Sequence, residues 1–359
     1  MSNNSNQLFQ RFEEIRFSKD VKSLQTLNDT YFERKINNNL FEDNLEISDE
    51  ITPHLNKSIK KVIKNLNIES LEIKFFVHAS SEIQANCIAA SRNKCFISFS
   101  SALINLFDEN EFRFVVGHEL GHFLLGHHDL KVNDNDNFNF DFIVNSRAKE
   151  ISVDRIGLIA SRNLNASISA MIKTMSGLNS IHLKINVSKF LSQLNKLNTS
   201  ASSDNIYSTH PPIVLRSRAL LWFSTINKFE NFDKSDLVSL KNIDKKIVLD
   251  LDKFLDNPIK EKLNEYCTDV KIWLTGKKII NIGKFSKKHQ KIFSEEFGKD
   301  NLNKFKKFIG LFNNKKIEGE IELKLAESLS LIKNHFPESY ENKITEINSN
   351  IEELFSSEC

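Results

Sequence analysis

The sequence predicts an α+β fold that is mainly helical and contains a small β-sheet. The chain has 359 residues but only 10 glycines and 5 prolines, so few positions interrupt helices. Apolar residues recur at helical spacing over long stretches, for example at Ile59, Val62 and Leu66. Between residues 71 and 101 the period changes, and short segments rich in aromatic and β-branched residues favour strands instead.

The elements follow one another in a simple order. Helices are expected over residues 8–36, 51–67, 102–130 and 142–180, and again from about residue 225 onward. Strands are expected at 71–80 and 93–101, with 81–91 as a third, edge-like strand between them. The Asn- and Asp-rich stretch 132–141 is expected to be a surface loop, because it lacks the glycine and closing glutamate of an EF-hand. A second loop is expected at 194–212, and its final Pro-Pro can open the next helix.

Changes of composition along the chain predict three parts. An N-terminal helical segment is expected over residues 1–50, and the domain that carries the motifs over 51–225. A helical C-terminal domain of unknown role follows over 226–359. Residues 281–298 faintly resemble a turn of the small all-helical TerB-like domains, without their acidic metal-binding residues.

Charge and cysteine content exclude several classes of protein. The 49 Lys plus Arg nearly cancel the 47 Asp plus Glu, so no nucleic-acid-binding surface is indicated. The N-terminus has no secretory apolar core, and no run of 18 apolar residues occurs, which predicts a soluble, cytoplasmic protein without a transmembrane segment. Four well-separated cysteines with no CxxC pair fit a reducing compartment and exclude a cysteine zinc site.

The stretch FRFVVGHELGHFLLGHH, residues 112–128, contains an HExxH motif within an apolar helix. His118 and His122 are four residues apart, so both can present a nitrogen to one zinc ion from the same helix face. Glu119 then lies on the neighbouring flank, where the water of a catalytic site would be bound. His127 and His128 are expected to end the helix or to support the site rather than to bind the metal.

A third ligand is expected 28 residues beyond His122, in SRAKEISVDRIGLIA. Glu150 and Asp154 share one helix face, so Glu150 can complete a His2Glu site for one zinc per chain. Asp154 can accept a hydrogen bond from the free nitrogen of a zinc histidine, with His118 preferred. The alternative is an exposed helix face on which the two carboxylates pair with Lys149 or Arg155.

These residues resemble a known family. VVGHELGHFLLGHH followed by EISVDRIGL is similar to the zinc metallopeptidases of the CAAX prenyl protease and HtpX group, in the gluzincin clan. The likeness extends from about residue 50 to STHPPIVLRSRALLW at 208–222. It implies a zincin-like metallopeptidase domain that hydrolyses peptide bonds of a protein or peptide substrate. Many family members have transmembrane helices around the active site, and this chain has no comparable segment.

The resemblance also implies roles for individual residues. Glu119 is the general base for a zinc-activated water. His210 stabilises the oxyanion or closes over the zinc as a fourth ligand; otherwise it is a helix-capping surface histidine. Asn86 and Arg216 are possible substrate-binding residues, and the strand around 84–90 is a place for an extended substrate to pair.

The leading hypothesis is a soluble zinc-dependent endopeptidase, and two other functions are also compatible with the sequence. In the first, a regulatory protein cleaves or binds one specific partner, such as a repressor, and uses the helical tail as a sensor. In the second, the chain is a catalytically silent scaffold that binds zinc for stability. Glu119 argues against the scaffold, because a purely structural site needs the ligands but not the base.

Overall fold

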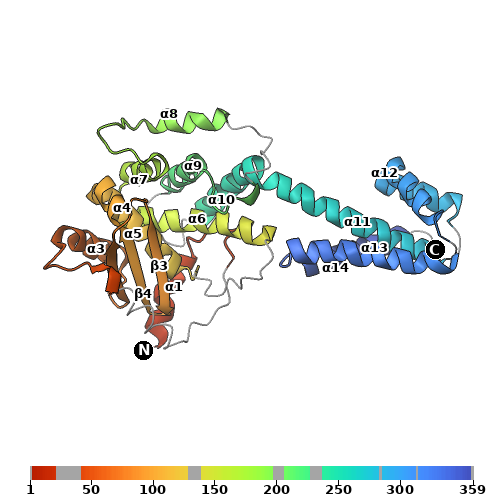
Figure 1. Cartoon of the computed structure of the whole chain (residues 1–359), viewed down its shortest axis with the longest axis horizontal. Helices are drawn as coiled ribbons and strands as arrows, with labels where there is room; N and C mark the ends of the chain where they lie inside the picture. Colours follow the sequence, from red (N-terminus) through yellow and green to blue (C-terminus); the bar gives the residue numbers. More distant parts are fainter. Residues whose placement is uncertain are drawn as a thin grey trace. The chain divides into compact units, whose positions relative to one another are not determined.

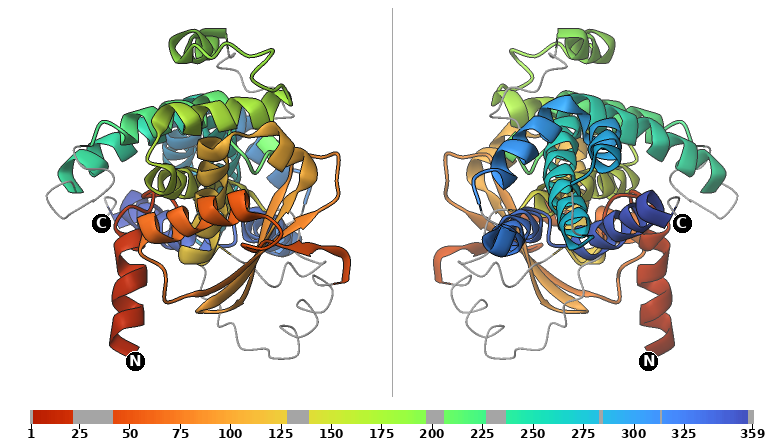
Figure 2. Two further views of the ribbon diagram at one scale, coloured as in Figure 1. Left: turned by 90° about the vertical axis from the view of Figure 1, so that its left-hand side faces the viewer. Right: turned by 90° about the vertical axis from the view of Figure 1, so that its right-hand side faces the viewer.

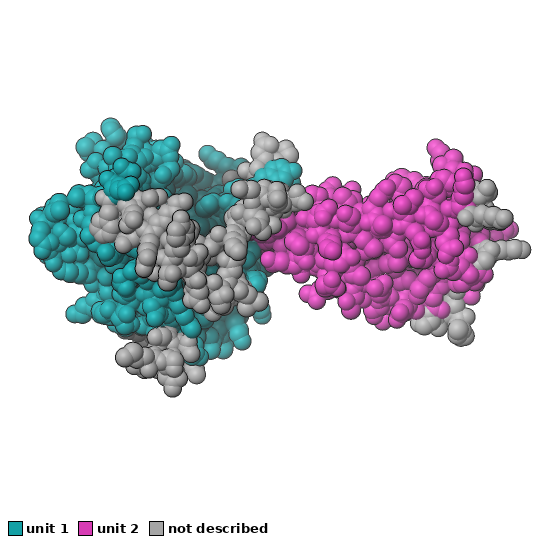
Figure 3. Space-filling model, turned by 60° about the horizontal axis from the view of Figure 1, so that its bottom comes forward, with its two compact units in different colours: residues 1–132, 145–254 teal, residues 133–144, 255–359 magenta. Residues whose placement is uncertain are grey.

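The computed structural model describes residues 2–21, 42–127, 139–196, 206–226, 237–282, 285–312 and 314–356. It divides into two compact units, which Figure 3 distinguishes by colour. Unit 1 comprises residues 1–132 and 145–254, and unit 2 comprises residues 133–144 and 255–359. Unit 1 thus extends to residue 254, and the domain boundary expected at 225 stays a prediction.

A four-stranded sheet lies in unit 1. Its strands are β1 (Leu45–Glu46), β2 (Glu72–His78), β3 (Ala85–Ser91) and β4 (Lys94–Ser100), in the order β1-β2-β4-β3. β2 and β4 are parallel, whereas β1 pairs with β2 and β3 pairs with β4 in antiparallel fashion. The three strands predicted from the sequence are confirmed, and β3 occupies an edge of the sheet as expected. The short β1 was not predicted.

Aromatic residues cover both faces of this sheet. Phe99 on β4 stacks with Phe75 on β2 and meets Phe112 edge-on, with ring centroids 5.0 Å apart in the second pair. On the opposite face Phe76 and Phe96 form a buried cluster with Ala90. The alternation of these side chains explains why the segments adopt the period of strands rather than that of helices.

Helices α3 (Pro53–Leu66), α4 (Ser101–Leu106) and α5 (Glu109–Leu124) pack beside the sheet, as Figures 1 and 2 show. The sequence predicted a single helix over residues 102–130, but the chain breaks between α4 and α5. Asp108 is the reason: its carboxylate accepts hydrogen bonds from the backbone N–H groups of Asn110 and Glu111. The carboxylate of Glu111 in turn accepts a hydrogen bond from the backbone N–H of Asp108. This capping box starts a new helix, and α5 carries the HExxH motif.

Glycines bring α5 very close to α6 (Phe140–Ser161). A Cβ atom added at Gly117 would lie 2.2 Å from Cβ of Ala160, and one added at Gly121 would lie 3.0 Å from Cβ of Val153. On the facing helix, a Cβ at Gly157 would meet the Phe114 ring at 2.8 Å. The absence of side chains at these positions lets the two helices approach one another, and with them the histidines of α5 and the carboxylates of α6.

The other helical elements of unit 1 surround this pair. They are α1 (Ser2–Glu13), α7 (Leu164–Ser176), α8 (Val187–Leu191), the 3-10 helix η1 (Ser192–Lys196), α9 (Ile213–Phe223) and α10 (Leu237–Leu251). Of the expected helical segment 1–50, the described part is helical over α1 and at residues 42–43, whereas residues 14–21 form turns and extended chain and Leu45–Glu46 form β1. The side chains of Phe12, Ile15 and Phe17 are buried, so this segment belongs to the core of unit 1.

Unit 2 consists mainly of long helices. They are α11 (Asn257–Asn281), α12 (Lys287–Ile309), α13 (Asn314–His335) and α14 (Tyr340–Ser356); the π-helix η5 (Asp252–Asp256) precedes α11. Phe293 and Phe305 stack at its centre with ring centroids 5.0 Å apart, beside Ile279 and Ile321. The expected helical C-terminal region is thus observed. Among the described helices, none is both long enough and apolar enough to cross a bilayer.

Candidate metal centre

The three expected metal ligands converge between α5 and α6. The Nε2 atom of His118 lies 3.7 Å from Oε2 of Glu150, and Nε2 of His122 lies 3.6 Å from Oε1. One donor atom of each residue lies within 4.8 Å of the other two. Two ligands at about 2.1 Å from a tetrahedral zinc would be about 3.4 Å apart, so the spacing fits this ion. The donor set of two imidazoles and one carboxylate also fits zinc.

Asp154 supports this group from α6, one helical turn beyond Glu150. Its Oδ1 lies 3.0 Å from Nδ1 of His118, which leaves Nε2 of that ring directed to the metal site. The exposed-face alternative is not what the structure has, because Glu150 and Asp154 are both buried. Although burial alone would raise the pKa of Asp154, Arg216 and His118 hold it below its usual value.

Arg216 binds both carboxylates. Its Nε and Nη2 donate to Asp154 at 2.8 and 2.7 Å, and Nη1 lies 2.8 Å from Oε2 of Glu150. The sequence suggested a substrate-binding role for Arg216, and its pairing with the two carboxylates was not predicted. The sequence signal for this pairing was the surplus of acidic groups, because Glu119, Glu150 and Asp154 together require a cation. Arg216 was a candidate for that cation, since it follows a helix-starting Pro-Pro.

Glu119 lies on the same cavity as the three ligands. This cavity has a volume of about 420 Å³ and is also lined by apolar side chains of α4, α5, α7 and α9. Burial raises the pKa of Glu119 to about 7, and the Glu150 charge adds to this, whereas His118 and Arg216 oppose it. A carboxyl group of this pKa can take up and release a proton near neutral pH.

The edge strand β3 forms one wall of the cavity through Ala85, Asn86 and Cys87. Asn86 is exposed, as a residue available to a substrate must be. The pKa of the Cys87 thiol is well above its usual value because of burial and the neighbouring Cys95 and Glu119, so the thiol is neutral. Cys87 was not singled out from the sequence.

His210 reaches the cavity from the segment before α9. Its Nε2 lies 3.5 Å from Oε1 of Glu150, and its Nδ1 lies 3.0 Å from Oγ1 of Thr209. About two thirds of its side chain is exposed. His127 lies behind His122, with the two Nδ1 atoms 3.2 Å apart. His128 and most of the loop at 132–141 lie outside the described residues.

Comparison with known families gives one match for this part of the chain. Residues 50–134 match the model of peptidase family M48, and this range includes strands β2, β3 and β4, helix α5 and the HExxH motif. Comparisons with curated proteins and with solved structures gave no match. M48 peptidases are metallopeptidases, so the predicted resemblance to the CAAX prenyl protease and HtpX group is confirmed. Residues 50–134 are thus similar to peptidase family M48, and the match covers this part of the chain alone.

Proposed function

We propose that the protein is a zinc-dependent endopeptidase in which His118, His122 and Glu150 bind one zinc ion and Glu119 is the general base. The observation that supports this most strongly is the convergence of the three ligands on a cavity that Glu119 also lines. A structural zinc site is usually closed by a fourth protein ligand, whereas a catalytic site has three and faces open space.

Zinc, when bound, lowers the pKa of a coordinated water and polarises a substrate carbonyl. The protein residues do the remaining work. Glu119 accepts the proton of the attacking water and returns it to the leaving amine. A general base works best when its pKa is near the operating pH, and the raised pKa of Glu119 suits this task. Asp154 holds the ring of His118, while Arg216 holds both carboxylates of α6 in place.

The edge position of β3 supports an extended polypeptide as the substrate. An edge strand offers unpaired backbone N–H and C=O groups, to which a substrate segment can add as a further strand. β3 borders the cavity directly, so such a segment would pass Glu119. Because the binding is through main-chain atoms, cleavage within a chain is expected rather than removal of terminal residues. Asn86 is proposed to contact this substrate.

His210 has two possible roles that a single variant separates. If His210 donates a hydrogen bond to the developing oxyanion, His210→Ala lowers turnover by roughly a hundredfold and leaves zinc affinity unchanged. If His210 is instead a reversible fourth ligand of the zinc, His210→Ala raises activity and weakens zinc retention. We favour the donor role, because Pro211 and Pro212 stiffen the segment that follows. Unchanged turnover together with unchanged affinity would exclude both roles.

Zinc binding is tested first. After reconstitution and removal of free metal, the wild type is expected to contain about one zinc per chain. A variant with both His118→Ala and His122→Ala should contain almost none. His54→Ala is the matched control, since His54 is exposed on α3 and outside the site. Zinc that persists in the double variant would refute the ligand assignment.

Catalysis is tested with Glu119→Gln. The amide is nearly the same size as the carboxylate but does not accept the proton, so zinc content is unchanged and hydrolysis is lost. Cleavage of an unfolded protein is followed by mass spectrometry, in which internal cuts identify an endopeptidase and trimmed ends an exopeptidase. Zinc binding without cleavage of any substrate by the wild type would favour the silent scaffold. Cleavage of one partner alone would favour the regulatory protein.

A further inference from the structure

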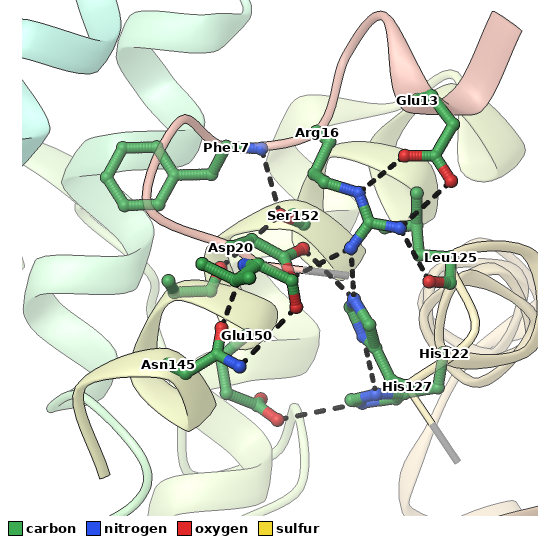
Figure 4. Close-up of polar contacts among 12 residues, drawn as sticks. Glu13, Arg16, Phe17, Asp20, His122, Leu125, His127, Asn145, Glu150 and Ser152 are labelled. Carbon is green, nitrogen blue, oxygen red and sulfur yellow. Dashed lines mark hydrogen bonds and ion pairs between the residues drawn. The ribbon is translucent and has the colours of Figure 1, made fainter. Parts of the chain in front are cut away.

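His127 is enclosed between a metal ligand and a buried carboxylate, as Figure 4 shows. Its Nδ1 lies 3.2 Å from Nδ1 of His122, and its Nε2 lies 3.0 Å from Oδ2 of Asp20. The His127 side chain is only 2% exposed and that of Asp20 is fully buried. Residues 107 positions apart in the chain thus meet directly behind the metal centre.

The end of helix α5 places His127 there. Gly126 has a φ of +67°, a left-handed conformation that glycine adopts without strain. The chain therefore changes direction after the helix. The backbone N–H of His127 donates to the carbonyl of His122 at 2.9 Å, and the backbone N–H of Gly126 donates to the carbonyl of Phe123 at 3.1 Å. This pair of bonds is a Schellman motif. It brings the rings of His122 and His127 to a centroid separation of 5.2 Å.

The direction of the hydrogen bonds follows from the proposed ligand. If Nε2 of His122 binds the metal, the proton of the neutral ring is on Nδ1 and is donated to Nδ1 of His127. The proton of His127 is then on Nε2 and is donated to Asp20. Nη1 of Arg16 also lies 3.4 Å from that Nε2, but both are donors. Arg16 instead donates to Oδ1 of Asp20 at 2.9 Å.

Asp20 is itself held firmly. The Arg16 guanidinium, which binds Asp20, also donates to the carboxylate of Glu13 at 2.8 and 3.1 Å. It donates as well to the carbonyl of Leu125 at 2.6 Å. The backbone N–H of Phe17 donates to Oγ of Ser152, which is two residues from Glu150 on α6. The segment from Glu13 to Asp20 is therefore bonded to the end of α5 and to the middle of α6. These are the two helices that supply the ligands.

We propose that Asp20, fixed in place by Arg16, holds the metal ligand His122 through His127, so that these two residues of the N-terminal segment support the metal centre. The inference rests on the proposed zinc site and extends it. Asp154 fixes His118 directly, and Asp20 fixes His122 through one intervening imidazole. Each zinc histidine thus has a buried carboxylate that sets its tautomer and ring orientation. His127 is a positioning residue in this scheme.

Two amide substitutions separate the two roles of His127. One role is to position the metal ligand His122, and the other is to attach the N-terminal segment through Asp20. In His127→Asn the side-chain oxygen takes the place of Nδ1 and still accepts from His122, but the side chain does not reach Asp20. In His127→Gln the amide nitrogen takes the place of Nε2 and still donates to Asp20, but the acceptor for His122 is lost. His127→Phe keeps a ring and loses both bonds.

Zinc affinity, measured by competition with a chromogenic chelator, is the first readout. We expect a loss of roughly ten- to a hundredfold in His127→Phe and His127→Gln and a clearly smaller loss in His127→Asn. The visible spectrum of the cobalt-substituted protein should change in the same order, because it reports the ligand geometry. Thermal unfolding of the metal-free variants measures attachment of the segment separately.

A variant of Lys19 is the matched control. Its Nζ pairs with Asp252 at 2.9 Å, so Lys19→Met removes an attachment of the same segment without touching the His127 bonds. This variant should lose some stability and bind zinc as the wild type does. Better binding by His127→Gln than by His127→Asn, or wild-type affinity and spectra in all His127 variants, would overturn the inference. Failure of the wild type to bind one zinc would instead refute the proposed function.

Discussion

Close approach of α5 and α6 is expected to control both stability and metal binding, and Gly117→Ala tests this directly. The new Cβ would lie 2.2 Å from Cβ of Ala160, whereas carbon atoms in contact are about 3.5–4.0 Å apart. The helices must therefore separate locally by roughly 1.5 Å. Overpacking of this kind costs about 1–3 kcal/mol, and the better helix propensity of alanine returns up to about 1 kcal/mol.

The net loss in the free energy of unfolding is therefore about 1–2 kcal/mol. For a unit of this size, that corresponds to a fall in melting temperature of roughly 2–8 °C, measured by circular dichroism. Zinc affinity should fall too, because this separation is much larger than the roughly 0.2 Å within which zinc–ligand distances usually vary. Gly319→Ala is the control: a Cβ there has no neighbour within 4 Å, so this exposed helical position should gain about 0.5–1 kcal/mol.

A compensating substitution makes the test specific. Ala160→Gly removes the nearest atom, but Cα of Gly157 would still lie 3.0 Å from the new Cβ. The double variant of Gly117→Ala and Ala160→Gly should therefore recover part of the stability and part of the zinc affinity, with a coupling energy of about 1 kcal/mol. Strictly additive effects, or a Gly117→Ala protein as stable as the wild type, would refute the packing argument.

Three further predictions concern buried charges. Asp154→Asn should weaken zinc binding roughly ten- to a hundredfold in a chelator competition, and unchanged affinity would contradict its contact with His118. Lys173→Met leaves Glu111 without its partner at 2.6 Å and should cost about 3–5 kcal/mol in chemical denaturation, much of which Glu111→Gln restores in the double variant. In the metal-free protein the pKa of Glu119 is about 7, whereas in the unfolded chain it is about 4.5. The free energy of unfolding therefore falls as the pH rises from about 4.5 through about 7. Above pH 7 metal-free Glu119→Gln should therefore be more stable than the wild type by up to roughly 3 kcal/mol, with no such gain at pH 4, and a difference independent of pH would contradict this.

Local periodicity determined most of what the sequence by itself revealed. A helix puts residues four apart on one face, so the spacing of His118 with His122 and of Glu150 with Asp154 was enough to recognise both pairs. The strands were equally legible, because segments 71–80 and 93–101 are short and rich in aromatic and β-branched residues. The boundary between α4 and α5 was missed although Asp108 and Glu111 spell a capping box.

Only the tertiary structure decided which distant groups meet. Arg216 was a possible substrate-binding residue from the sequence, and the packing of α9 directs its guanidinium to Asp154 and Glu150. Asp20 had no motif around it at all, and its contact with His127 depends on the turn at Gly126 and on how residues 14–20 cross two helices. Sequence spacing encodes the geometry within one helix, whereas contacts between elements depend on their mutual placement. That placement is a property of the whole core.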